Sequence, residues 1–263
     1  MFGSTRGYLD EPILRRCYDL ANLSPAEARQ LLVGLDIQSD LAYRHFVPIL
    51  SAIATEDRRC LVVDYREPGL SLSAYLHPFR RARVLVPEDT IWNIASQLLS
   101  ALVHIHSMIG DSDGVSYAVV HRNLTPDTIF ISNGVLWITG FESAMMLRRG
   151  EMTDDVPILT NYMAPEIRTG QLYDERADVW SVGAILWEIC AGARFTGINA
   201  ADATGEGLGS IRGYHPELAE LINGLLRPVA HRLTAERAKQ HPRLRRFAHA
   251  AILIPDPPIV DTY

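Results

Sequence analysis

Residues 121–142 hold side chains that could do chemistry, in the stretches His121-Arg-Asn-Leu-Thr-Pro-Asp-Thr128 and Gly140-Phe-Glu142. Asp127 and Glu142 are carboxylates, which are the protein ligands that magnesium prefers. Neighbouring residues on an extended segment point in opposite directions, so Asp127 does not face the same way as Thr128. We therefore expect both acids to face solvent. The alternative is that they form a metal site of their own.

Histidines and cysteines add no further site. His104 and His106 are two positions apart in a predicted helix, so they do not face each other and predict no metal pair. The three cysteines are widely spaced, and an odd count fits no disulfide framework, which indicates reduced thiols in a cytosolic protein. They are Cys17, Cys60 and Cys190. We predict no metal site.

The bulk composition excludes some partners. The chain has 263 residues and a formal net charge of −6, so it has no basic surplus to neutralise nucleic-acid phosphates. Arg243-Leu-Arg-Arg246 is a local basic patch, which we interpret as a solvated helix end. The start lacks a signal peptide, and the longest apolar stretch, Val179 to Ala193, is too short to span a bilayer. We predict a soluble cytoplasmic protein that binds neither nucleic acid nor membrane.

The positions of the elements follow from periodicity and end signals. Ser24-Pro25-Ala-Glu27 is a strong helix start, with an N-cap hydroxyl, a first-turn proline and a glutamate to close a capping box. Ser132-Asn-Gly134 is typical of a hairpin turn. The predicted helices cover 24–40, 88–106, 177–191 and 216–226, and the predicted strands cover 12–17, 47–53, 60–65, 118–120, 129–131 and 135–138. Arg66-Glu-Pro-Gly69 reads as a hinge between a small mixed lobe and a larger helical lobe.

Five motifs in order resemble protein kinases. His121 to Ile131 resembles the catalytic loop, and Gly140-Phe-Glu142 stands where the family has Asp-Phe-Gly. Asn161-Tyr-Met-Ala-Pro-Glu166 resembles the end of the activation segment, Tyr173 to Gly183 the start of helix F, and Arg232 to Pro242 the end of the fold. The resemblance implies an α+β bilobal fold, with a shortened β-rich N-terminal lobe (1–65), a helical C-terminal lobe (66–250) and a tail (251–263).

Three stretches narrow the resemblance to the NIMA-related (Nek) kinases. Leu23 to Leu32 aligns without gaps on the start of helix C in that family. Ser112-Asp-Gly114 resembles a small insertion that many Nek kinases carry, and Tyr173 to Trp180 is typical of them. The resemblance implies a cytoskeletal or cell-cycle setting.

The catalytic positions that the resemblance assigns are replaced. Asn123 stands where the family has the loop aspartate that accepts the substrate proton, and an amide cannot take a proton at neutral pH. Losing a general base typically costs a factor of about 10² to 10⁴ in rate. The loop lysine is Thr125. Thr128 and Gly140 stand at the positions where the family has its two metal ligands. We therefore expect neither ATP nor magnesium to bind as a cofactor.

The small lobe differs from the family as well. The same alignment puts the strand lysine at Arg16 and its helix C glutamate at Gly34, which removes the ion pair. Gly3 and Gly7 do not form a glycine-rich loop. Either the chain starts inside the second strand of the lobe, or it is a truncated form.

A nucleotide pocket at the hinge is the remaining possibility in this lobe. The resemblance makes Val63 the gatekeeper, and a vestigial pocket would be formed by Val63, Asp64 and Tyr65.

The structural motif residues are kept. The resemblance implies that Glu166 pairs with Arg232 and that Asp178 binds the backbone around His121 and Arg122. It also places His121 and Phe141 in a hydrophobic column, which we expect to be broken at its top by the polar Gln38.

Two threonines of the activation segment, Thr153 and Thr160, are candidates for phosphorylation, although surface threonines are common. Arg122 would be the partner of such a phosphate.

Two hypotheses follow. The first is a Nek-like pseudokinase, an inactive interaction or regulatory scaffold whose partner is a protein such as an active kinase or a cytoskeletal protein. The alternative is a Ser/Thr kinase with residual or unconventional ATP binding and phosphoryl transfer. The tail, with Pro255-Asp-Pro-Pro258, is interpreted as an extended strap, a disordered end or a docking segment.

Overall fold

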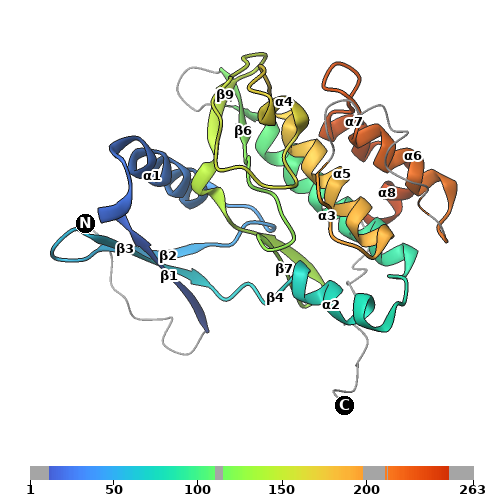
Figure 1. Ribbon diagram of the computed structural model, residues 1–263, viewed down its shortest axis with the longest axis horizontal. Coiled ribbons are helices and arrows are strands. Elements are labelled where there is room, and N and C mark those ends of the chain that lie inside the picture. The colour runs from blue at the N-terminus through green and yellow to red at the C-terminus, as the bar shows by residue number, and fades with distance from the viewer. Residues whose placement is uncertain (1–11, 110–114, 198–210, 212, 249–263) are drawn as a thin grey trace.

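The N-terminal region combines a small antiparallel sheet with one long helix, as the blue elements of Figure 1 show. The computed structural model describes residues 12–109, 115–197, 211 and 213–248. The sheet has the strand order β1-β3-β2. Its elements are β1 (Ile13–Asp19), a 3₁₀ turn η1 (Leu20–Asn22), α1 (Pro25–Asp40), β2 (Ile49–Ala54) and β3 (Cys60–Arg66).

Local sequence explains why α1 begins where it does. The Ser24 hydroxyl accepts from the Glu27 amide, and the Glu27 carboxylate accepts from the Ser24 amide at 2.8 Å. This capping box satisfies two amides that the first helical turn leaves without partners, and it confirms the predicted helix start. Leu31 and Leu35 on one face of α1 then pack against the inward-facing side chains of β3, forming a small hydrophobic cluster.

The C-terminal region is mainly helical and surrounds α3 (Glu88–His106), which spans the predicted range. This helix packs against α5, α7 and α8, and most of its side chains are buried. The helices are α2 (Leu72–Ala82), α4 (Pro165–Arg168), α5 (Arg176–Ala191), α6 (Pro216–Leu225), α7 (Ala235–Lys239) and α8 (Pro242–Ala248). Helix α2 has no counterpart in the sequence prediction, because Pro78 inside it is a strong helix breaker.

Two short sheets lie between these regions, with the strand orders β4-β7-β8 and β5-β6-β9. Their elements are β4 (Leu70–Ser71), β5 (Met108–Ile109), β6 (Ser116–Val120), β7 (Ile129–Ser132), β8 (Val135–Ile138), a 3₁₀ turn η2 (Phe141–Ser143) and β9 (Met145–Arg148). Asn133 and Gly134 both have positive φ, as a two-residue hairpin between β7 and β8 requires. The predicted hairpin is confirmed.

The observed architecture confirms the α+β class. The two ends of the predicted domain ranges, 1–11 and 249–263, lie outside the described residues, as does the Ser112-Asp-Gly114 stretch. The three predicted domain ranges stay predictions. Within the described part of the chain, no helix has both the length and the apolar character needed to cross a membrane.

Candidate active-site cleft

The loop after β6 is held by a carboxylate from α5. Asp178 accepts hydrogen bonds from the backbone amides of His121, at 2.8 Å, and Arg122, at 2.9 Å. Arg122 has a φ of 62°, an uncommon conformation for a residue with a side chain, so the loop needs such an anchor. The predicted role of Asp178 is confirmed.

His106 is a partner of Asp178 that the sequence did not reveal. Its Nε2 lies 3.0 Å from the Asp178 carboxylate. Burial alone would raise the pKa of Asp178, but the hydrogen bonds from His106 and the His121 amide outweigh it and the pKa is lowered. His104, two positions earlier on α3, instead stacks on Tyr43 with ring centroids 4.0 Å apart. The two histidines therefore face different ways, as predicted.

The side chains at the three replaced loop positions form hydrogen bonds with nearby backbone groups. Asn123 donates from Nδ2 to the Gly140 carbonyl at 3.3 Å. The Thr128 hydroxyl accepts from the Thr125 amide at 3.0 Å and lies 2.9 Å from the Asn123 carbonyl oxygen. The Thr125 hydroxyl accepts from the Asp127 amide at 3.2 Å. None of these side chains offers a base or a cation to a reaction, and together they stiffen the loop.

Gly140 is where the family would supply a metal-binding carboxylate. Its φ is 91°, and a Cβ built on it would lie 2.7 Å from Thr128 Cγ2. A side chain at this position would therefore be strained and would displace Thr128. Asp127 is exposed, in agreement with the interpretation of that acid. Among the residues that the structure describes, no three His, Cys, Asp or Glu side chains form a group that could hold a metal ion.

Glu142 is engaged by the small lobe and is only partly exposed, which corrects the sequence interpretation. Its carboxylate lies 3.0 Å from Arg16 Nη1 of β1 and accepts from the Tyr18 hydroxyl at 2.5 Å. The Tyr65 hydroxyl lies 2.9 Å from that of Tyr18. Burial, and then the Glu142 charge, raise the pKa of Tyr18, so its hydroxyl stays protonated and donates. Gly34 of α1 contributes no acid and lies against the backbone of Phe141.

The three proposed pocket residues are packed rather than open. Val63 and Tyr65 are completely buried in the small-lobe cluster. Burial raises the pKa of Tyr65 to about 12. Asp64 alternates to the other face of β3, where it pairs with Arg15 at 2.7 Å. A cavity of about 260 Å³ at the lobe junction is lined by other residues, including Val47, Arg66, Glu67, Asn133 and Trp137.

The hydrophobic column continues above Phe141 through a residue that the sequence analysis missed. The His121 ring lies 4.4 Å from the Phe141 ring, and Phe46 meets Phe141 edge to face at 5.4 Å. Gln38 is buried and donates to the Val47 carbonyl at 2.8 Å. The only sign of this role in the sequence was that Phe46 immediately precedes the apolar run of a predicted strand.

The Arg122 side chain binds an acid of the activation segment. Its Nη1 lies 2.5 Å from Asp155 and 3.1 Å from the Tyr173 hydroxyl, and its Nε donates to the Ser143 carbonyl. Thr153, a predicted phosphorylation site, pairs through its backbone with Tyr173. Arg122, which was predicted to bind a phosphate, is therefore paired with a carboxylate of this chain.

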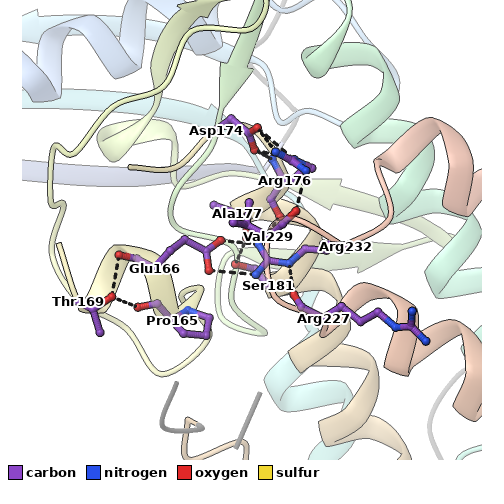
Figure 2. A network of polar contacts seen from close by, with 10 residues as sticks. All are labelled: Pro165, Glu166, Thr169, Asp174, Arg176, Ala177, Ser181, Arg227, Val229 and Arg232. Carbon is purple, nitrogen blue, oxygen red and sulfur yellow. Dashed lines mark hydrogen bonds and ion pairs between the residues drawn. The ribbon is translucent and has the colours of Figure 1, made fainter. Parts of the chain in front are cut away.

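A buried ion pair joins the end of the activation segment to the far end of the lobe (Figure 2). Arg232 donates to both carboxylate oxygens of Glu166, at 2.5 and 3.0 Å, and its guanidinium lies 5.0 Å from the centre of the Trp180 ring. Arg232 also donates to the carbonyls of Arg227 and Arg176. The predicted pairing of Glu166 with Arg232 is confirmed.

The anchored loop, the aromatic column and the buried Glu166–Arg232 pair define a protein kinase fold. The family model described as "Protein kinase domain" matches residues 19–244, so this chain belongs to the protein kinase domain family. Human serine/threonine-protein kinase Nek11 is 25% identical over 214 residues, which cover 79% of this chain and 32% of that protein. Probable serine/threonine-protein kinase nek2 of Dictyostelium discoideum is 29% identical over 175 residues, covering 66% and 40%.

Nek proteins are thus among the homologues of this chain, together with other kinases. Serine/threonine-protein kinase 36 of Pongo abelii is 32% identical over 174 residues, which cover 64% of this chain and 12% of that protein. The chain spans well under half the length of these curated relatives.

Proposed function

We propose that this chain is a Nek-like pseudokinase domain that acts by binding and regulating a protein partner, not by transferring phosphate. The observation that carries the proposal is Gly140, which has no side chain to hold a metal and where an added Cβ would lie 2.7 Å from Thr128 Cγ2. Glu142, the nearest acid in sequence, is engaged by Arg16 and Tyr18. These residues do not fit a magnesium ion held by carboxylates.

The proton-transfer position supports the same proposal. Asn123 stands where the family has its base and uses its amide to bind the Gly140 carbonyl, so this position has no group that could accept a proton from a substrate hydroxyl. The residues that hold the large lobe together, by contrast, are bonded as the family fold requires. A stable kinase-like surface without a phosphoryl-transfer site is suited to binding an active kinase or a cytoskeletal protein in the cytoplasm.

The first test is a thermal-shift measurement with ATP, with and without magnesium or manganese, followed by an autophosphorylation assay. We expect no metal-dependent stabilisation and no phosphate incorporation, with an active Nek kinase domain as the positive control. The matched variant Asp127→Asn/Glu142→Gln removes the two candidate carboxylates. Metal-dependent stabilisation and phosphate incorporation that this variant abolishes would establish the alternative, a kinase with unconventional chemistry.

A pull-down with the intact protein tests the partner. We expect an active kinase or a cytoskeletal protein to be retained by the folded chain but not by heat-denatured chain. Retention of nucleic acid or lipid vesicles in place of protein would contradict the proposal.

A further inference from the structure

Gly34 and the backbone of η2 are in unusually close contact. A Cβ built on Gly34 would lie 2.0 Å from the Phe141 carbonyl oxygen and 2.9 Å from the Glu142 Cα. These are backbone atoms, so they cannot rotate aside as a side chain would. The same Phe141 carbonyl accepts from the Ala144 amide at 2.7 Å, which closes the 3₁₀ turn. Only a glycine at position 34 therefore lets η2 lie this close to α1.

A second contact from α1 holds the same segment one helical turn earlier. Gln30 donates from Nε2 to the Ala144 carbonyl at 2.8 Å. Residues four apart lie on the same face of a helix, so Gln30 and Gly34 present one continuous surface to η2. The backbone of 141–144 is thereby held by packing at one end and by a hydrogen bond at the other.

This close packing sets the position from which Glu142 reaches β1. Its carboxylate meets Arg16 at 3.0 Å and Tyr18 at 2.5 Å, and Arg16 also lies over the Tyr65 ring, 5.7 Å from its centre. Arg16 and Glu142 keep 29% and 20% of their side-chain surface exposed, so the pair is shielded but not sealed from water. Charge-assisted hydrogen bonds of this kind are stronger than neutral ones.

We propose that Gly34 and Glu142 form a latch that fixes the start of the activation segment against α1 and β1 without nucleotide or metal. Arg16 of β1 pairs with Glu142 of the activation segment and not with an acid of α1. Because Gly34 has no side chain, the backbone that carries Glu142 has space to lie against α1. The two positions depend on each other, because a side chain at 34 would expel the backbone that carries Glu142. The latch is a property of conformation and does not depend on whether the domain transfers phosphate.

Hydrogen–deuterium exchange of the intact protein, followed in peptides that cover residues 141–148, tests the latch. Glu142→Gln should speed exchange there about tenfold, the factor expected when a hydrogen bond to a charged group is lost. Asp154→Asn is the matched control, because Asp154 is an exposed acid on the same segment and lies outside the measured peptides. Arg16→Gln/Glu142→Gln should exchange no faster than Glu142→Gln alone.

Gly34→Ala tests the packing half of the latch. Alanine favours helix over glycine, so any faster exchange at 141–148 must come from the clash with η2. The control is Gly224→Ala in α6, where an added Cβ would meet only the end of the Leu233 side chain. Local exchange should rise for Gly34→Ala and not for Gly224→Ala. Exchange at 141–148 that is unchanged in Glu142→Gln, or additive effects of the Arg16 and Glu142 substitutions, would overturn the latch even if Gly34→Ala does not fold.

Discussion

Arg232 in the large lobe donates to both carboxylate oxygens of Glu166, and the two side chains keep 0% and 5% of their surface exposed. Arg16 in the small lobe reaches one oxygen of Glu142, and both side chains remain partly in water. The first pair stands where the resemblance to protein kinases predicted it, whereas the second joins Arg16 to an acid of η2 and not to position 34 of α1, which is a glycine. Each pair joins distant parts of the chain, but they differ in how completely water is excluded.

The difference in burial predicts different costs for breaking the two pairs. Removing one partner of a buried pair leaves an uncompensated charge, so single substitutions are strongly destabilising. A partly exposed charge can be hydrated when its partner is lost, so each half can change in turn. We therefore expect the loss of Glu142 to cost the small lobe less stability than the loss of Glu166 costs the large lobe.

The largest expected effect comes from a matched pair of substitutions in the two regions. Glu166→Gln should lower the free energy of unfolding by about 3–5 kcal/mol, since it strands the buried Arg232. Glu142→Gln should lower it by about 1 kcal/mol, since Arg16 stays partly hydrated. Urea denaturation followed by circular dichroism measures both. Equal losses would mean that burial does not distinguish the two pairs, and Arg232→Lys, which keeps the charge, provides a second measurement if Glu166→Gln is too unstable to purify.

The second-largest expected effect is a loss of free energy of unfolding at acidic pH, through a histidine where the two regions meet. His45 is buried beside β8, with Nδ1 2.9 Å from the Leu136 carbonyl oxygen. Burial first, and then the nearby charges of Arg44 and Lys239, lower its pKa to about 4. The unfolded chain takes up this proton near pH 6.5, so the contribution of His45 is complete above that pH and is lost as pH falls toward 4.

The loss from His45 should reach about 3 kcal/mol by pH 4, because each pKa unit corresponds to about 1.4 kcal/mol. Urea denaturation at pH 7 and at about pH 4.5 measures it, with His45→Gln as the variant that removes the titration. His77→Gln, at an exposed histidine, is the control. If the free energy of unfolding depends on pH equally in the wild-type and His45→Gln proteins, His45 is not the group that causes the loss of stability.

Local signals in the sequence were sufficient to predict much of the fold. Helix α1 was predicted from its capping box, α3 from its apolar period, and the β7–β8 hairpin from Asn133-Gly134, because each depends on residues within a few positions. The roles of Glu166, Asp178 and Arg232 followed from motif positions in the family. Helix α2 was not predicted, although Ser71 caps its start, and Pro78 inside it is a residue that typically breaks helices.

The rebuilt contacts could not be predicted in the same way. Arg16 and Glu142 are 126 positions apart, and neither stands where a family motif would pair it with the other. An exposed acid was the reasonable expectation for Glu142, since its neighbours in sequence give no sign of the space that Gly34 leaves. The replacement of residues at the family's catalytic positions was predicted from single positions, but the contacts made around Gly34 and Glu142 depend on the packing of α1 against η2.

The smallest expected effect concerns Asp155, the large-lobe counterpart of Glu142 as an acid of the activation segment. Asp155 is 59% exposed, whereas its partner Arg122 is 1% exposed and retains hydrogen bonds to Ser143 and Tyr173. Asp155→Ala should therefore lower the free energy of unfolding by about 1 kcal/mol, the upper end of the range for an ion pair with a solvent-exposed partner. Asp154→Ala, at its exposed neighbour, should change it by less than about 0.5 kcal/mol.

Urea denaturation of the two alanine variants measures the difference, and it also tests the phosphorylation prediction. If Asp155 substitutes for a phosphate, phosphorylation at Thr153 should add no stability to the wild-type chain, because Arg122 is already paired. Equal stability of Asp155→Ala and Asp154→Ala would show that the Ser143 carbonyl and the Tyr173 hydroxyl satisfy Arg122 by themselves. The large lobe would then hold its activation segment without a charge from it, and the use of an activation-segment acid would be confined to the small-lobe side of the cleft.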